Sequence, residues 1–259
     1  MNAKAVSLSV GAVAVVSAGL YYLFAWHSEP PPVTPVPVAA QPQPAIANPV
    51  PDATAPQALP ALDGSDEFAM NELITLLGQP FVQKHLVPQN LIRNIVVTID
   101  NLPRKKFSQN RNPVAPIAGQ IDSQSDVTTT LGPAQYARYD EFMQGVMAVD
   151  SKQLVAVYFK LYPLFQEAYK SLGYPNGYFN DRVVTVIDHL IATPYAKEPV
   201  ELVNGPGIYQ FADPALESLS AGQKIIVRMG PENGAKARAK LKEIRALVAT
   251  GVPAKVQGN

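Results

Sequence analysis

The sequence predicts a mainly α-helical domain with one or two short β-hairpins, preceded by an N-terminal transmembrane helix and a proline-rich linker. An unbroken apolar run extends from Ala5 to Trp26, and a proline-rich stretch follows between Pro30 and Pro60. Beyond the linker, apolar residues recur at intervals of three or four, the spacing of amphipathic helices. We therefore divide the chain into a short N-terminus (1–4), an anchor (5–26), a linker (27–63) and one domain (64–259).

The apolar run has the length of a membrane-spanning helix. At about 1.5 Å per residue it measures about 33 Å, and a bilayer's hydrocarbon core is about 30 Å thick. The alternative is a secretory signal cleaved near Ser17, a small residue in a suitable setting. Cleavage there would leave an exposed apolar start to the mature chain, whereas Tyr21, Tyr22 and Trp26 suit a membrane interface. We therefore expect a retained anchor.

The charges beside the apolar run predict its orientation. Lys4 and the terminal amine lie on one side, and His27 and Glu29 lie on the other. Positive charge favours the cytoplasmic side, so we expect a cytoplasmic N-terminus and a periplasmic domain. The sequence thus predicts a single-pass protein of a bacterial inner membrane.

The linker alternates proline with small or apolar residues, as in Pro35–Val38 and Gln41–Pro44. Such a tract favours extended polyproline II without a packed core. About 30 residues at about 3.1 Å each would reach about 90 Å at most. We expect a spacer; the alternative is a proline-rich ligand for an aromatic groove.

The first half of the domain predicts two helices and a polar loop. One helix begins behind a Ser65 cap and ends at Gly78, and the second lies between Pro88 and Pro103. From Pro103 to Pro133 the chain is polar and contains few apolar residues. We expect an extended loop there, with one short hairpin over 117–131.

The strongest helical period lies between Ser151 and Leu172, behind a Ser151 cap. Pro163 lacks a backbone donor and clashes with the preceding turn, so we expect a kink or a break near Tyr162. Gly173 should end this helix.

The chain after Gly173 predicts three helices and one hairpin. The first of these helices is capped by Asn180 and Asp181 and stops at Pro194. Two short strands, 200–203 and 207–211, surround a glycine turn. The last two helices run over 221–229 and 233–248.

Several short motifs in the second half of the domain resemble a known family. The motifs include Tyr162–Tyr169, Leu172–Pro175, Tyr178–Arg182, Ile187–Leu190 and Arg228–Pro231. Together they resemble the bacterial family named Domain of Unknown Function 3014, from about Leu62 to the C-terminus. The resemblance implies one coherent domain behind an anchor and a proline-rich linker, and it implies no activity.

A polymer hydrolase is the catalytic alternative, with Asp181 and Asp188 as acid and base beside His189. Seven residues place both carboxylates on one helix face, about 10 Å apart along the axis. That separation suits groups acting on opposite sides of a bond. The competing interpretation is a capping Asp181, an Asp188 and an Arg182 in salt bridges, and a partly buried His189.

The sequence has no motif for binding a metal, a cofactor or a nucleic acid. The three histidines are far apart and there is no cysteine, so we expect neither a metal nor a cofactor. The chain has 21 basic and 21 acidic residues, which argues against nucleic-acid binding. The basic segment Lys236–Arg245 is expected to be a solvated helix face, with binding to anionic lipid or cell wall as the alternative.

We expect a non-catalytic binding or scaffold domain whose partner is an envelope protein or a wall polymer. Aromatic residues with arginine form many binding hot spots. The candidate binding residues are Tyr174, Tyr178, Phe179, Arg182 and Arg228. The alternative is that these tyrosines line the core with their hydroxyls at its edge.

Overall fold

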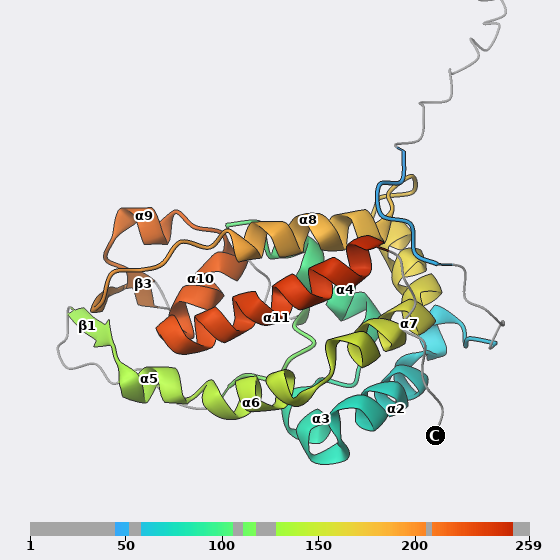
Figure 1. Ribbon diagram of the computed structural model, residues 1–259, viewed down its shortest axis with the longest axis horizontal. Helices are drawn as coiled ribbons and strands as arrows, with labels where there is room; N and C mark the ends of the chain where they lie inside the picture. Colours follow the sequence, from blue (N-terminus) through green and yellow to red (C-terminus); the bar gives the residue numbers. More distant parts are fainter. Residues whose placement is uncertain (1–44, 52–57, 106–110, 118–127, 206–208, 251–259) are drawn as a thin grey trace, which may run out of the picture. The chain divides into compact units, whose positions relative to one another are not determined.

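The computed structural model describes residues 45–51, 58–105, 111–117, 128–205 and 209–250 (Figure 1). The chain divides into two units, Met1–Gln43 and Pro44–Asn259, and the fold below is that of the second. The expected anchor over 5–26 and most of the linker lie outside the described residues. Among the residues that are described, no helix has both the length and the apolar character needed to span a bilayer.

The second unit is mainly helical, as predicted, and holds a small antiparallel sheet. In the described part of its first half lie a short 3-10 helix and six α-helices: η1 (Leu62–Gly64), α2 (Asp66–Leu77), α3 (Gln79–His85), α4 (Leu91–Asn101), α5 (Pro133–Ala137), α6 (Asp140–Ala148) and α7 (Ser151–Ser171). The second half contains four more helices: α8 (Phe179–Ile191), α9 (Pro214–Glu217), α10 (Ala221–Arg228) and α11 (Gly230–Thr250).

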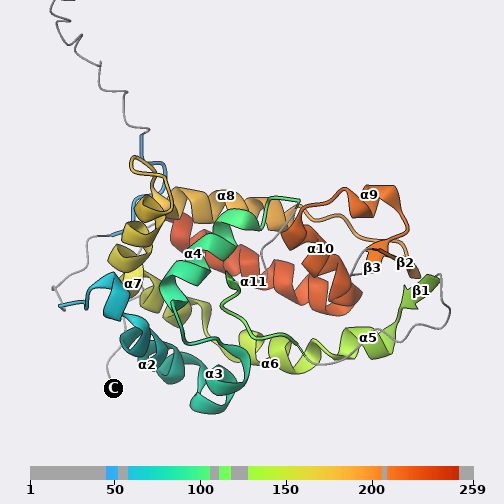
Figure 2. The ribbon, with the colours of Figure 1, turned by 180° about the vertical axis from the view of Figure 1, so that it is seen from behind.

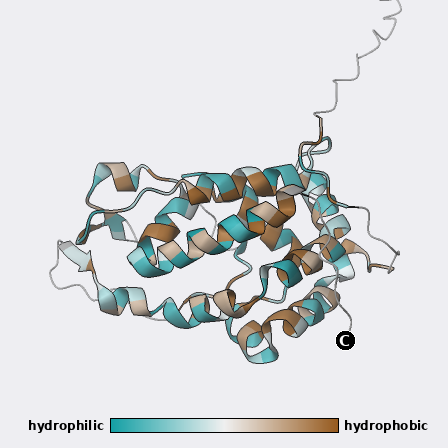
Figure 3. Ribbon diagram, in the orientation of Figure 1, coloured by the Kyte–Doolittle hydropathy of each residue, from teal (hydrophilic) through white to brown (hydrophobic). Residues whose placement is uncertain are grey.

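Four helices enclose the main core. In Figure 1 α11 crosses the side nearest the reader, and in Figure 2 α4 lies nearest on the opposite side. Figure 3 shows hydrophobic and hydrophilic residues alternating along α8, as an amphipathic helix requires. The buried residues include Leu91, Ile92, Val96, Leu161, Phe165, Tyr169, Phe179, Val183, Ile187 and Val248. These residues from α4, α7, α8 and α11 form one contiguous core.

In the described residues the sheet has three antiparallel strands in the order β1-β2-β3. The pairing of β2 (Val200–Asn204) with β3 (Tyr209–Phe211) confirms the expected pair of strands, and residues 206–208 between them lie outside the described part of the chain. The expected hairpin over 117–131 falls mostly on residues 118–127, which lie outside the described part of the chain. Its described end, β1 (Thr128–Leu131), pairs with β2. Leu131, Leu202 and Phe211 form a second, smaller core with α9 and α10.

The central helix differs from the prediction at its N-cap and at Pro163. A kink or a break was expected near Tyr162; the break is wrong, since α7 continues through Pro163 as one helix, and the kink stays a prediction. The cap is Asp150 rather than Ser151, because the Asp150 carboxylate accepts from the amides of Lys152 and Gln153. Ser151 instead donates its hydroxyl to Glu243 on α11, which joins the two helices.

Part of the linker packs on the domain. Val50 and Pro51, which precede the undescribed residues 52–57, are partly buried. Val50 and Leu59 both pack against the main core. The compact unit therefore includes residues 45–51 and 58–63, which the sequence analysis assigned to a linker without a packed core. Figure 1 shows the earlier of these segments, in blue, beside the turn between α7 and α8.

Candidate functional site

The predicted binding turn between α7 and α8 is held in place by α7. Its Gln166 side chain accepts from Tyr162 Oη and from the amide of Phe179, and donates to the carbonyl of Gly177 at 2.8 Å. Tyr174 stacks on Tyr169 with ring centroids 4.6 Å apart. The turn is thus a braced part of the fold.

Phe179, one of the predicted binding residues, belongs to the core. Its exposed fraction is 0%, and its ring stacks on that of Phe165. A side chain with no exposed surface has no area to offer a partner. Of the candidate residues in the turn, only Tyr174, Tyr178 and Arg182 retain exposed surface.

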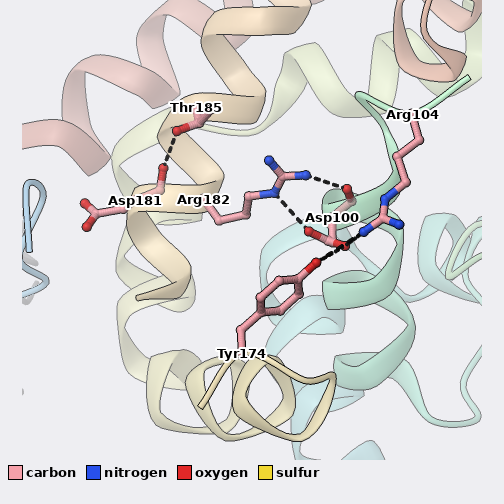
Figure 4. A network of polar contacts seen from close by, with 6 residues as sticks. All are labelled: Asp100, Arg104, Tyr174, Asp181, Arg182 and Thr185. Atoms are coloured by element: carbon pink, nitrogen blue, oxygen red, sulfur yellow. Dashed lines mark hydrogen bonds and ion pairs between the residues drawn. The ribbon is translucent and has the colours of Figure 1, made fainter. Parts of the chain in front are cut away.

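Arg182 and Tyr174 both bind the buried carboxylate of Asp100 on α4 (Figure 4). Arg182 Nε donates to Asp100 Oδ1 at 3.0 Å, and its Nη2 donates to the Asp100 carbonyl at 2.7 Å. Arg104 Nη2 and Tyr174 Oη donate to Asp100 Oδ2 at 2.7 and 3.3 Å. Asp100 is only 2% exposed. The network therefore links α4 to α8 and to the turn through a buried carboxylate.

Arg228 is not part of this surface. Its guanidinium lies 4.8 Å from the centre of the Phe211 ring and donates to the carbonyl of Tyr209 at 2.8 Å. Burial lowers the pKa of Arg228, with partial compensation from the charge of Glu217. Arg228 therefore stabilises the hairpin at the second core, and the structure does not bring it to the turn.

The start of α8 binds a segment of the linker. Asp181 accepts three hydrogen bonds: from the amide of Ala47 at 3.1 Å, and from the amide and side-chain nitrogen of Asn48 at 2.7 and 2.9 Å. Tyr178 Oη accepts from the amide of Val50 at 2.7 Å. Figure 4 shows Asp181 directed away from Arg182, toward the opposite side of α8. Asp181 was expected to cap α8, but the N-cap is Tyr178 and the carboxylate holds the linker.

Asn180 connects this segment to the core. It is completely buried, and its Nδ2 donates to the carbonyls of Asn48 at 2.9 Å and of Val248 at 3.0 Å. Its Oδ1 accepts from Tyr158 Oη at 3.1 Å. Burial raises the pKa of Tyr158 well above that of an exposed tyrosine, so this hydroxyl stays a neutral donor. Asn180 thus joins α7, α8, α11 and the linker.

Sequence reasoning missed the linker side of this contact. The signal available was compositional: Asn48 is the only asparagine, and Ile46 the only isoleucine, in a linker of mostly proline, valine, alanine and glutamine. Asparagine followed by proline also favours a local turn. A deviation of this kind from a repetitive tract is where a specific contact should be sought.

The carboxylates of the hydrolase alternative are engaged in other contacts. Asp188 forms a two-bond ion pair with Arg245, whose Nε and Nη2 donate at 2.5 and 3.0 Å. These hydrogen bonds lower the pKa of Asp188, whereas a general acid needs a raised pKa. His189 is partly buried and its Nε2 lies 2.8 Å from Ser220 Oγ, the hydroxyl that caps α10. The predicted salt bridges of Asp188 and Arg182 are confirmed.

The Asp188–Arg245 pair gives a pH-dependent contribution to stability. Because the pKa of Asp188 is lowered in the folded state, its contribution is present above about pH 4 and is lost as the pH falls through the folded pKa. We expect Arg245→Gln to lower the urea midpoint at pH 7 by at most about 0.3 M, since the pair is exposed. The difference between the variant and the native chain should shrink as the pH falls below about 4, because Asp188 becomes protonated. A difference that does not shrink as the pH falls would contradict the assignment.

The basic helix differs from the expected solvated face. Arg238 and Lys240 are buried, at 8% and 5% exposure. Lys240 donates its ammonium to the carbonyl of Val149 just after α6, and Arg238 lies over the Tyr195 ring at 4.2 Å. Carbonyls at a helix C-terminus have no partner in the helix, so a lysine there is stabilised. Two of the five basic residues are therefore buried in the fold, and a third, Arg245, is paired with Asp188.

Within the described ranges, no three histidine, aspartate or glutamate side chains lie close enough to hold a metal ion. A family model described as "Protein of unknown function (DUF3014)" matches residues 91–245. The chain belongs to the DUF3014 family. No curated protein and no solved structure matches it. The matched region contains Tyr178, Asn180 and Asp181, whereas Asn48 and Val50 precede it.

Proposed function

We propose that this DUF3014 protein is a membrane-anchored component of the bacterial cell envelope, whose helical domain binds or scaffolds a partner without catalysing a reaction. In this proposal residues 5–26 span the inner membrane once, the N-terminus is cytoplasmic, and the domain is periplasmic. The apolar run and the position of Lys4 support this topology. The partner is a protein of the envelope, with a wall polymer as the second candidate.

The observation that carries the binding role is the contact between α8 and the linker. The side chains of Tyr178 and Asp181 accept from the main chain of a linker segment, and that of Asn180 donates to it. Main-chain recognition of this type is a common way for domains to bind peptides. The contact shows that this end of the domain has the chemistry needed to hold a chain segment.

No observation favours the hydrolase with Asp181 and Asp188. The Asp181 carboxylate accepts three hydrogen bonds from the linker, and Asp188 is paired with Arg245. A working acid and base would face a common substrate with their pKa values shifted apart. We therefore retain the binding role alone.

The topology is tested by proteolysis. We expect added protease to remove the domain in cells whose outer membrane has been permeabilised. In inverted inner-membrane vesicles, whose cytoplasmic face is outside, the domain should stay intact. Digestion in the inverted vesicles alone would place the domain in the cytoplasm and contradict the proposal.

The partner is tested by photocrosslinking in living cells. A photoreactive residue placed at Asn176, at the exposed tip of the turn, should capture one envelope protein that mass spectrometry identifies. The matched control is the same residue at Lys242, which is also exposed but lies on α11. Absence of a product from Asn176, or the same product from both positions, would contradict a partner site at the turn.

A further inference from the structure

The linker segment Ala47–Val50 is held in the manner of a bound peptide. Its hydrogen bonds to the domain come from Asp181, Asn180 and Tyr178, and four of the five involve its main chain. The two ends differ in burial: Ala47 is exposed, whereas Val50 is partly buried against the core. The segment thus contributes little to the core and much to a polar contact.

We propose that Tyr178, Asn180 and Asp181 form a binding site for an Asn-Pro peptide, and that its resident ligand is the chain's own residues 47–50. The site rests on the geometry of this contact. Its consequence for the distance between domain and membrane also rests on the anchor proposed above.

The positions of the donors and acceptors explain the preference for Asn-Pro. Asp181 accepts from two successive amides, those of Ala47 and Asn48, and Tyr178 accepts from the amide of Val50. Between them lies Pro49, the one residue that has no amide hydrogen to satisfy. The side chain of Asn48 adds a third bond to Asp181, which an aspartate at the same position would replace with repulsion between two carboxylates.

Occupancy of the site changes the free length of the linker. With the segment bound, the chain between the proposed anchor and the domain runs from residue 27 to residue 46, about 20 residues or about 60 Å when extended. Release would add residues 47–57, about 11 more, or about 34 Å, because Leu59 packs against the core and holds the chain there. The contact therefore acts as a latch that holds the domain closer to the membrane than its linker would allow.

The first test measures hydrogen exchange in the purified full chain. We expect Asp181→Asn to speed exchange of the amides of Ala47 and Asn48 at least about tenfold, because their acceptor is weakened. Asp188→Asn is the matched control, since it removes the charge of another carboxylate on the same helix, and it should leave these amides unchanged. Equal exchange in the native chain and Asp181→Asn would overturn the latch.

The second test asks whether the site accepts a separate peptide. The full chain carrying Asn48→Asp should release its own segment and bind a synthetic peptide with the sequence of residues 44–52, PAIANPVPD. A control peptide with aspartate in place of the asparagine should bind at least about tenfold more weakly. Failure of the native peptide to bind the folded variant, or equal binding of both peptides, would overturn the site.

These tests use purified protein, so they are separate from the crosslinking in cells. Peptide binding without a captured partner would support the latch and contradict the partner role. A captured partner with no peptide binding would support the partner role and overturn the latch.

Discussion

Replacing Asp100 by alanine is expected to lower the free energy of unfolding by about 3–5 kcal/mol, because it leaves buried positive charge without a partner. Asp100 is 2% exposed and accepts from Arg182, Arg104 and Tyr174. The Arg182 side chain is only 26% exposed, so water does not fully replace the lost carboxylate. Urea unfolding of the purified chain, followed by circular dichroism, measures the change.

The control for this prediction is an exposed ion pair of the same kind. Asp63 binds Arg93 at 2.6 Å, but the Asp63 side chain is 88% exposed. We expect Asp63→Ala to cost less than about 1 kcal/mol. Adding Arg182→Met to Asp100→Ala should recover part of the loss, because it removes the unpaired charge. Similar losses for Asp63→Ala and Asp100→Ala would contradict the central role of the buried carboxylate.

The parts of the fold that sequence alone predicted are those with strong local signals. The apolar residues of α4 and α8 recur at helical spacing, and both helices lie close to where that pattern put them. Gly173 follows the end of α7 with φ of +116°, a conformation that glycine adopts without strain. These features depend on residues adjacent in the sequence, so a single chain carries enough information to find them.

The parts that were missed depend on tertiary contacts. Helices such as α3 and α9 span seven and four residues, too few for a periodic pattern to stand out. The pairing of β1 with β2 joins Leu131 to Val200 across the whole of α7 and α8. The sequence of a strand does not identify a distant partner strand, so β1 was assigned to a local hairpin.

The candidate site was predicted in part for the same reason. The motif around Tyr178 and Arg182 was found, but its aromatic residues suit either a surface or a core, and Phe179 proved to be core. The contact with Asn48 could not be found from a binding motif, because most of it is made by backbone groups that every residue carries. Only the three-dimensional arrangement identifies the linker as the ligand.

Replacing Asn180 by leucine is expected to lower the free energy of unfolding by about 3 kcal/mol and to release the linker. Leucine is similar in size, but it leaves the hydroxyl of Tyr158 without its acceptor and the carbonyl of Val248 without its donor. Each buried polar group left without a partner costs about 1–3 kcal/mol.

The same substitution should act on the linker through its lost bond to the carbonyl of Asn48. Hydrogen exchange at the amides of Ala47 and Asn48 should therefore rise, while urea unfolding reports the loss of stability. Asn176→Leu, at an exposed position three residues before Phe179, is the control and should change neither measurement appreciably. Loss of stability with unchanged exchange at Ala47 and Asn48 would separate the two roles of Asn180, because Asp181 would then hold the linker without it.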